Sequence, residues 1–290
     1  MPAAAARLRE LLRGPEPVIA PGVYDALGAR VVAAAGFDCV YMTGFGTSAG
    51  LLAAPDIGLV SFGEMVENAR RVAQAVSLPV IADADTGYGN ALNVARTVRA
   101  YEAAGLAGLH LEDQVAPKRC GHMEGKEVIS AAEMAQKVRA AVEARRDPDF
   151  VIIARTDARQ PLGLDAAIER GHRYAEAGAD VIFIEAPQSE EELERIAREF
   201  SLPLLFNWAE TGKTPPLPLA RIRELGYRLV LFPISLLLAA TRAMREVAAC
   251  IRRDGTPLAY RERMLSFAEF NEFIGLQEWR ETEARYRVDG

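Results

Sequence analysis

The stretch from residue 109 to residue 126, LHLEDQVAPKRCGHMEGK, holds more reactive side chains than any other part of the chain. Its apolar beginning is typical of a buried strand, and this strand ends in two acids, Glu112 and Asp113. The polar loop that follows contains Cys120 and three potential cations around it: Lys118, Arg119 and His122. Because positive neighbours lower the pKa of a thiol, Cys120 is predicted to act as a nucleophile or to exchange a proton. An incidental surface thiol is the alternative.

Carboxylates end two neighbouring candidate strands. Asp83 and Asp85 close one strand, and Glu112 closes the next strand along the chain. Parallel strands bring such ends to one edge, and carboxylates without nearby cysteine or histidine ligands favour a hard ion. The set therefore predicts a Mg²⁺ site, with Mn²⁺ as a substitute ion. For any single acid, a helix cap or an ion pair with Arg or Lys is the alternative.

Arg155 and Asn207 end two further strands and suit the binding of a small polyanion. The planar guanidinium of Arg155 matches the two oxygens of a carboxylate. The alternative for Arg155 is an ion pair with Asp157 or Glu185, which can coexist with substrate binding. Asn207 can donate to a second carboxylate or to a carbonyl oxygen. We therefore expect a small substrate rich in carboxylate oxygens.

The segment TGFGTSAG, residues 43–50, resembles a dinucleotide-binding loop only loosely, because it leads into Ala-Ala-Pro-Asp and not into a long helix. A backbone cradle for an oxyanion or a carboxylate is the better interpretation, and its residues are Thr43, Gly44 and Phe45. His122 is expected to bind substrate or to tune Cys120. Structural roles are expected for the remaining cysteines and histidines: Cys39, Cys250, His110 and His172.

Eight short apolar runs alternate with helical patterns, and they must position these side chains. The candidate strands are residues 18–20, 38–43, 79–85, 108–113, 150–157, 180–186, 203–208 and 228–232. Runs that are apolar on both faces are typical of parallel strands covered by helices. Eight such units predict a (β/α)8 TIM-type barrel, with an open doubly wound sheet as the alternative. Functional side chains then lie at the C-terminal ends of the strands.

No linker divides the chain, so one domain is predicted over residues 1–290, ending in a helical C-terminal extension over residues 256–290. Aromatic and aliphatic residues recur in this extension at helical spacing: Phe267, Phe270, Phe273, Ile274 and Trp279. This surface requires burial, either on the chain's own barrel or on another subunit.

Composition excludes several partner classes. The net charge of −6 does not suggest a positively charged surface for binding phosphates, so no nucleic-acid partner is expected. The apolar run LVLFPISLLLAA is broken by Pro233 and is too short to span a bilayer, and the N-terminus lacks a signal-peptide core. Three scattered cysteines do not form a disulfide framework. We expect a soluble, cytoplasmic protein without a membrane partner.

Seven motifs together resemble the isocitrate lyase / phosphoenolpyruvate mutase superfamily: PGVYDALGAR, PDIGL, ADADTGYGN, LEDQVAPKRCGH, IARTDA, IEAP and NWAETGKTP. The resemblance covers residues 17 to 285, and KRCGH is similar to the signature of its lyases. Phosphonate-handling members carry an Asn-containing segment there, so Cys120 argues against carbon–phosphorus chemistry. Chain length and motifs resemble the short-chain branch of 2-methylisocitrate lyases, 2,3-dimethylmalate lyases and petal-death-type 2-alkylmalate lyases.

The resemblance implies a Mg²⁺-dependent homotetramer, a dimer of dimers that exchange the eighth helix. It implies that Asp85 binds the metal directly, while Asp56, Asp83 and Glu112 hold it largely through waters. It also implies a set of residues that line the substrate site: Thr43, Gly44, Phe45, Asp83, Gly121, His122, Arg155, Glu185, Asn207 and Glu210.

Two departures from the family pattern concern the substrate. Phe45 stands where 2-methylisocitrate lyases tend to have Gly, so it narrows the pocket and favours a smaller 2-alkylmalate over a tricarboxylate. Pro233 stands at the site where oxaloacetate hydrolases of the family tend to carry a hydroxyl residue, which disfavours hydrolysis.

The resulting hypothesis is an oxo-acid lyase that cleaves a 2-hydroxy di- or tricarboxylate to a 2-oxo acid and a carboxylate. Cys120 is the general acid, and His122, Arg155 and Glu185 complete the catalytic set. The alternatives are an oxaloacetate decarboxylase or hydrolase, a phosphonopyruvate-type enzyme of the same superfamily, and a barrel that binds a dicarboxylate without turnover.

Overall fold

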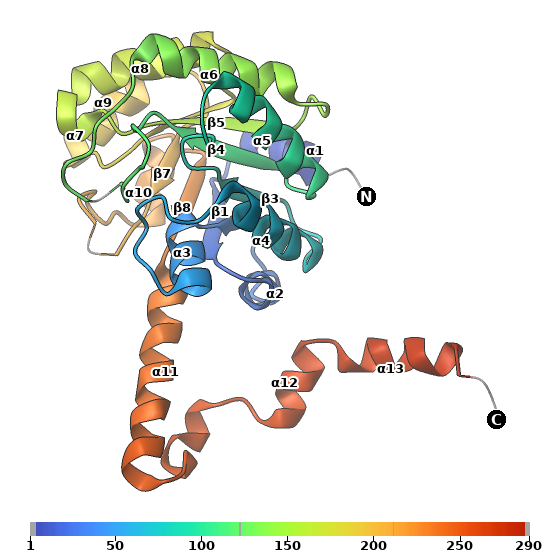
Figure 1. Cartoon of the computed structure of the whole chain (residues 1–290). Helices are drawn as coiled ribbons and strands as arrows, with labels where there is room; N and C mark the ends of the chain where they lie inside the picture. Colours follow the sequence, from blue (N-terminus) through green and yellow to red (C-terminus); the bar gives the residue numbers. More distant parts are fainter. Residues whose placement is uncertain (1–3, 122, 211, 288–290) are drawn as a thin grey trace. The chain divides into compact units, whose positions relative to one another are not determined.

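The computed structural model describes residues 4–121, 123–210 and 212–287 (Figure 1). The chain forms two compact units, Met1–Leu237 and Leu238–Gly290. The first unit contains all the strands assigned in the described residues, and the second consists of helices. The prediction of a single domain over residues 1–290 stays a prediction.

The strands of the first unit form a nearly closed parallel barrel. Their bounds are β1 Val18–Val23, β2 Val40–Met42, β3 Val80–Asp83, β4 Gly108–Glu112, β5 Val151–Thr156, β6 Val181–Ile184, β7 Leu205–Asn207 and β8 Leu229–Phe232. Their order is β6-β5-β4-β3-β2-β1-β8-β7, and a parallel bridge between Ile182 and Leu204 joins the two outer strands. The predicted TIM-type barrel is therefore confirmed, and the open doubly wound sheet is wrong.

Helices alternate with the strands: those between β1 and β8 cover the outside of the barrel, the first precedes β1, and the last continues into the second unit (Figure 1). Their bounds are α1 Ala4–Arg13, α2 Ala26–Ala34, α3 Gly44–Leu52, α4 Phe62–Gln74, α5 Ala91–Ala103, α6 Ala131–Ala144, α7 Arg159–Leu162, α8 Leu164–Glu176, α9 Glu190–Glu199, α10 Leu219–Glu224 and α11 Ser235–Asp254. No helix in the described part of the chain has both the length and the apolar character needed to cross a membrane.

Capping residues set the ends of these helices. Ser61 and Glu64 form a capping box at the start of α4, which satisfies backbone N–H groups that lack helical partners. Glycines in the left-handed region follow α2, α5, α8 and α10, and they are the predicted C-terminal glycines: Gly36, Gly105, Gly178 and Gly226.

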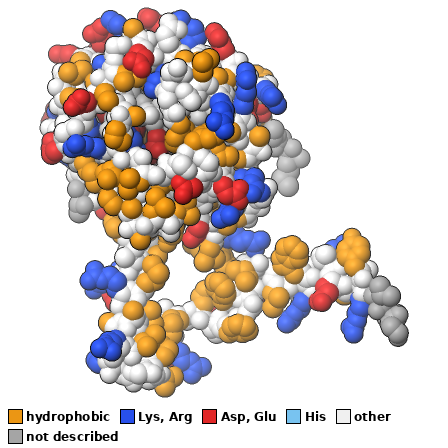
Figure 2. All heavy atoms as spheres, in the orientation of Figure 1, with side chains coloured by type: hydrophobic (Ala, Val, Ile, Leu, Met, Phe, Trp, Pro, Cys, Tyr) orange, Lys and Arg blue, Asp and Glu red, His pale blue; other side chains and the backbone are white. Residues whose placement is uncertain are grey.

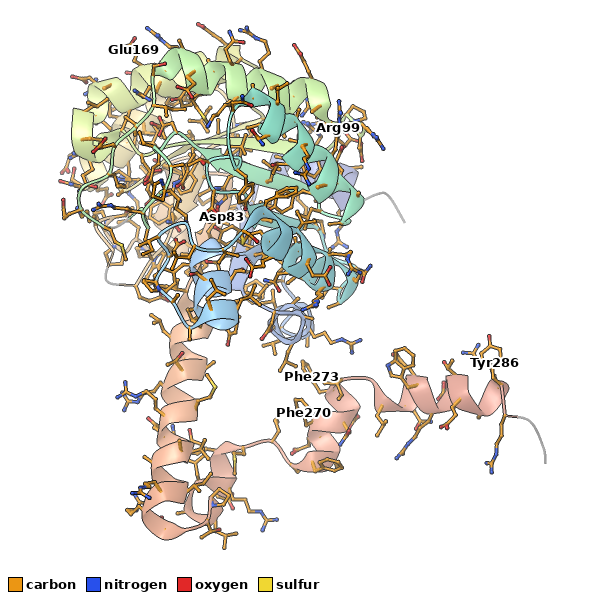
Figure 3. The ribbon with its side chains drawn as sticks, in the orientation of Figure 1. Asp83, Arg99, Glu169, Phe270, Phe273 and Tyr286 are labelled. Carbon is orange, nitrogen blue, oxygen red and sulfur yellow. The ribbon has the colours of Figure 1, made fainter. Side chains whose placement is uncertain are left out.

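The core has two layers. One layer lies between the strands and the outer helices, and the other fills the barrel interior. Leu8 and Leu12 of α1 are buried in the interior layer together with Val151 and Ile153 of β5. Because α1 closes the N-terminal end of the barrel, the C-terminal strand ends remain for the site. In Figure 3 Asp83 lies within the barrel, while Arg99 and Glu169 point outward from the covering helices.

The second unit begins within α11 and continues through a 3-10 helix, Leu258–Arg263, α12 Phe267–Phe273 and α13 Leu276–Arg285. The predicted helical C-terminal extension is confirmed. Figure 2 shows hydrophobic side chains on the surface of these helices. Phe267, Trp279 and Tyr286 are among the exposed ones. Exchange of the eighth barrel helix between subunits, which is the helix labelled α11 after β8, stays a prediction.

Candidate active site

A cavity of about 260 Å³ lies at the C-terminal ends of the barrel strands. Most of the predicted site residues line it: Thr43, Phe45, Asp56, Asp83, Cys120, Gly121, Arg155, Glu185, Asn207, Glu210 and Pro233. Gly44, Asp85 and Glu112 do not line the cavity but adjoin lining residues. His122 lies outside the described residues.

The acids predicted to hold a metal come from three segments. Asp83 ends β3, Glu112 ends β4, and Asp56 lies between α3 and α4. Asp85 follows β3 with a φ of 46°, in the left-handed region that few non-glycine residues adopt. Its backbone N–H donates to Asp83 Oδ1 at 2.9 Å, so the tight turn holds both acids at one strand end.

Lys118 from the loop reaches into this group of acids. Its Nζ lies 2.6 Å from Asp56 Oδ1 and 2.9 Å from Asp85 Oδ1. Burial raises the pKa of Asp85 to about 6, with Asp83 and Asp56 adding to the effect and Lys118 opposing it. Burial also raises the pKa of Glu112 well above its ordinary value, although Arg155 opposes the shift. In their ionised form, both acids therefore require a cation close by.

The donor set fits Mg²⁺ held mainly through waters. Within the described ranges, no three His, Cys, Asp or Glu side chains converge closely enough to ligate one ion directly. Glu112 Oε1 is buried without a hydrogen-bond partner among the described residues, so one acceptor remains for a metal-held water. Mg²⁺ keeps several waters and is bound through one or two carboxylates, so it does not require three side chains that converge on one point.

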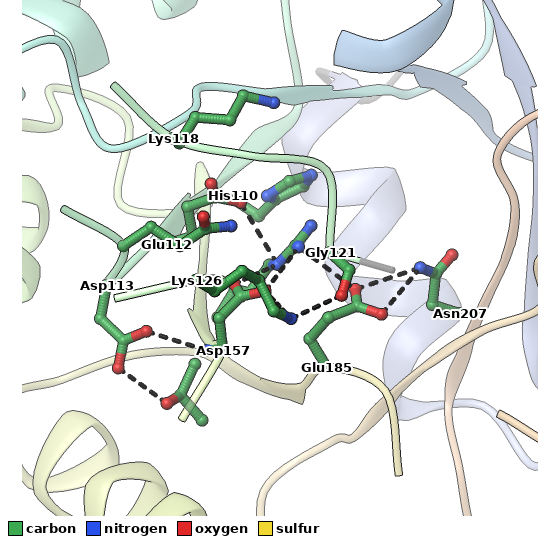
Figure 4. Close-up of polar contacts among 12 residues, drawn as sticks. His110, Glu112, Asp113, Lys118, Gly121, Lys126, Asp157, Glu185 and Asn207 are labelled. Atoms are coloured by element: carbon green, nitrogen blue, oxygen red, sulfur yellow. Dashed lines mark hydrogen bonds and ion pairs between the residues drawn. The ribbon is translucent and has the colours of Figure 1, made fainter. Parts of the chain in front are cut away.

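Arg155, the residue before the last of β5, lies among three carboxylates, which Figure 4 labels as Glu112, Asp157 and Glu185. Its Nε and Nη2 donate to Asp157 at 2.9 and 3.0 Å, and it lies 3.3 Å from Glu112 Oε2 and 3.5 Å from Glu185 Oε2. The ion pairs that were the alternative for Arg155 thus exist, and Arg155 lines the cavity as well. Although burial opposes it, Asp157, Glu112 and Glu185 raise the pKa of Arg155, so it stays charged.

Asn207 at the end of β7 contacts Glu185 beyond β6. Its Nδ2 donates to Glu185 Oε2 at 3.1 Å (Figure 4). Asn207 Oδ1 is buried and has no hydrogen-bond partner among the residues that the structure describes. The pair therefore presents both a carboxylate and an amide to the cavity.

The loop after β4 lies over these strand ends. An antiparallel bridge between Gln114 and Val128 closes its base, and the backbone N–H of Cys120 donates to Asp56 O at 3.1 Å. Gly121 packs so closely against Arg155 and Glu185 that a Cβ atom would overlap both side chains. Half-buried Cys120 is thereby held in the cavity wall.

The predicted cradle is the N-terminus of α3. The Thr43 side chain caps this helix by accepting from Gly46 N at 3.3 Å. A Cβ atom at position 44 would overlap the carboxylate of Asp83, so only glycine permits this approach. The helix has nine residues, so it is not the long helix that follows a dinucleotide-binding loop.

The sequence interpretation did not include four residues of the site in its predicted set: Tyr41, Lys118, Lys126 and Asp157. It named Lys118 beside Cys120, and it named Asp157 as a possible partner of Arg155. Tyr41 and Lys118 line the cavity, and Asp157 and Lys126 form a buried ion pair beside it. The density of charge in the loop was the available signal for the two lysines. No local pattern indicates which acids they reach.

His110 is buried beneath the site, as expected for a structural residue. Its Nε2 is 2.9 Å from the hydroxyl of Tyr41, and burial lowers its pKa to about 4. The imidazole is therefore neutral near pH 7. Asp113 directly follows β4, and its carboxylate accepts hydrogen bonds from Thr156, Tyr174 and Arg170. The same carboxylate accepts from the backbone N–H of Asp157 and so holds the backbone there.

Known proteins share both this sequence and this fold. Residues 8–252 match the family described as Phosphoenolpyruvate phosphomutase. A 2,3-dimethylmalate lyase from Eubacterium barkeri is 50% identical over 282 residues, covering 97% of this chain and 98% of that protein. A crystal structure of 2,3-dimethylmalate lyase superimposes with a TM-score of 0.93 at 40% identity and covers 100% of both chains.

Enzymes with other activities are also similar. An oxaloacetate acetylhydrolase, bound to 3,3-difluorooxalacetate, has a TM-score of 0.91 and 39% identity, covering 97% of this chain and 96% of that one. The family match, the sequence identities and the shared fold all indicate the same family. The chain is an enzyme that belongs to the PEP mutase/isocitrate lyase superfamily.

Proposed function

We propose that this enzyme is a Mg²⁺-dependent carbon–carbon lyase that cleaves a 2-hydroxy dicarboxylate of the 2-alkylmalate or 2,3-dimethylmalate type. The products are a 2-oxo acid and a carboxylate. The observation that carries the proposal is the position of Cys120 in the wall of a small cavity that Arg155 and Asn207 also line. The 50% identity to a 2,3-dimethylmalate lyase supports the same assignment.

The substrate carboxylate at C3 would lie against Arg155 and Asn207. The guanidinium keeps its charge because carboxylates surround it, and Asn207 adds an amide in the same wall. Both groups stabilise negative charge that grows as the C2–C3 bond breaks, because the bonding electrons move toward C3 and its carboxylate. The second carboxylate and the C2 hydroxyl would lie toward Asp85 and its neighbouring acids.

Asp85 would hold Mg²⁺ directly, while Asp56, Asp83 and Glu112 would hold it through waters. When bound, Mg²⁺ supplies Lewis acidity toward oxygens of the substrate. The C2 hydroxyl loses its proton to a base and becomes the carbonyl of the 2-oxo acid. Cys120 then gives its thiol proton to C3, which completes the second product and leaves a thiolate for the next proton.

The cavity favours a dicarboxylate over a tricarboxylate. Phe45 in α3 occupies the wall, and the remaining space is about 260 Å³. A 2-methylisocitrate carries one carboxylate more than a dimethylmalate and requires a cationic partner for it. We therefore place 2-alkylmalates ahead of 2-methylisocitrate as substrates.

Oxaloacetate chemistry is the second candidate, because the similar oxaloacetate acetylhydrolase shares the fold at 39% identity. Pro233 opposes it, since this wall residue offers no hydroxyl to bind a hydrated carbonyl.

A panel of substrates separates the candidates. The purified enzyme with Mg²⁺ is incubated with 2,3-dimethylmalate, 2-ethylmalate, 2-methylisocitrate and oxaloacetate; 2-oxo acids formed from the hydroxy acids are detected as hydrazones, and the products from oxaloacetate are identified by chromatography. Turnover of a 2-alkylmalate with the highest kcat/KM supports the proposal. Production of oxalate and acetate, or of pyruvate and CO₂, from oxaloacetate alone would contradict it.

The assembly we propose is a homotetramer. It is made of two dimers, and within each dimer the subunits exchange the helix that follows β8, α11. The exposed apolar residues of the second unit support it, because large apolar surface on a subunit is typically covered by another one. Light scattering after size exclusion measures the mass. A monomer at micromolar concentration would contradict the assembly.

A further inference from the structure

Lys126 joins the loop after β4 to the strand ends beneath it. This lysine is only 5% exposed, and its ammonium donates to the backbone carbonyl of Gly121 and, at 2.8 Å, to Asp157 Oδ1 (Figure 4). Gly121 directly follows Cys120. One buried cation therefore fixes the backbone on which the proposed general acid stands.

Asp157 links this lysine to Arg155. The same Oδ1 atom accepts from Lys126 and from Arg155 Nη2, while Oδ2 accepts from Arg155 Nε. The backbone N–H of Asp157 donates to Asp113 Oδ1 at 2.8 Å, which holds the carboxylate in place. The position of the loop and the orientation of Arg155 thus depend on one shared carboxylate.

The same loop has further contacts: Lys118 pairs with Asp56 and Asp85, the Cys120 N–H donates to Asp56 O, and Glu124 makes a contact at the outer surface. Glu124 accepts hydrogen bonds from Lys213 and Gln160, and its side chain is 80% exposed. Exposed ion pairs stabilise little because water screens them. The side chains of Lys126 and Asp157 are both fully buried, so loss of the lysine removes a cation from a site that water does not reach.

We propose that Lys126 is a positioning residue for the lyase reaction, and this inference rests on the proposed function. It holds the Gly121 carbonyl so that Cys120 remains in the cavity wall, and it shares Asp157 so that Arg155 keeps its orientation toward the substrate carboxylate. Without the Lys126 charge, the Gly121 carbonyl loses its buried donor, and Arg155 is the remaining described cation that pairs with Asp157.

The test uses the full-length enzyme with Lys126→Met and Lys126→Arg. Lys137→Met is the matched control, because Lys137 in α6 is also 5% exposed and its ammonium donates to a backbone carbonyl, Thr86 O, at 3.1 Å. The first readout is the rate at which iodoacetamide alkylates Cys120, followed by mass spectrometry of its peptide. We expect an increase of at least tenfold in Lys126→Met, a smaller one in Lys126→Arg and none in the control.

The second readout is kinetic. Lys126→Met should lower kcat about 100-fold and raise KM less than tenfold, since the proton donor moves more than the binding groups do. Thermal unfolding verifies that each variant is folded, and Lys126→Gln replaces Lys126→Met if the latter does not fold. Equal alkylation of Cys120 in wild type and Lys126→Met, or an equal increase in the Lys137→Met control, would overturn the inference. The alkylation result requires no turnover, so it remains decisive even if no panel substrate reacts.

Discussion

Lys118 Nζ lies 2.6 Å from Asp56 Oδ1, although the two residues are 62 positions apart in the chain. The same nitrogen lies 2.9 Å from Asp85 Oδ1. Burial by itself lowers the pKa of Lys118, but the surrounding acids, with Asp85 foremost, raise it well above its ordinary value. An internal ammonium therefore pairs with two of the acids that we propose hold Mg²⁺, so we expect the lysine and the metal to compete for the same carboxylates.

Replacement of Lys118 by Met should make stability depend more strongly on Mg²⁺. Removing one partner of a buried ion pair costs about 3–5 kcal/mol, so the metal-free variant should unfold at a lower temperature than wild type. Added Mg²⁺ should restore more of this loss than it adds to wild type, because the metal then has no competing ammonium. Thermal unfolding in EDTA and in excess Mg²⁺ measures both effects, and equal Mg²⁺ shifts in the two proteins would argue against competition.

Replacement of Cys120 by Ser should abolish turnover while preserving binding. A hydroxyl at position 120 is a far weaker acid than a thiol, so kcat should fall on the order of 10²–10⁴-fold. Calorimetry should show Mg²⁺ and pyruvate binding within about threefold of wild type, because Arg155, Asn207 and the acids are unchanged. Wild-type turnover in this variant would remove Cys120 from the mechanism.

Truncation of Phe45 to Ala should widen the substrate range. The side chain occupies the cavity wall, and one steric change in such a pocket alters discrimination by roughly 10–200-fold. We expect kcat/KM for 2-methylisocitrate to rise relative to that for 2,3-dimethylmalate. Because Ala favours the helical backbone of α3, the variant should stay folded, and its thermal unfolding temperature is measured as the control. An unchanged ratio would show that Phe45 does not select the substrate.

His110 should make the enzyme less stable in acid. Burial lowers its pKa from about 6.5 to about 4, so the unfolded chain takes up this proton before the folded protein does. The contribution of His110 is therefore fully present above pH 6.5 and is lost as the pH falls from about 6.5 towards 4, by roughly 3 kcal/mol at most. Urea unfolding across this range should show a steeper loss for wild type than for His110→Gln. Parallel profiles would contradict the neutral buried state.

The strands and their functional ends could be predicted from local sequence. Runs that are apolar on both faces alternate eight times with helical patterns, and four of these helices end at a glycine; this pattern allows few arrangements other than a barrel. Asp83, Glu112, Arg155 and Asn207 lie at strand ends, so the fold alone brings them to one edge. Their convergence follows from strand register, which pairs Glu112 with Arg155 on neighbouring strands.

The partners of the buried charges depend on tertiary structure alone. Lys118 and Lys126 belong to one loop and are eight positions apart, yet the first contacts Asp56 and Asp85 while the second contacts Asp157. These acids lie between 31 and 62 positions away along the chain. Local patterns report which faces are apolar and where elements end. Charge pairing depends on the path of an irregular loop, which long-range packing and desolvation determine together.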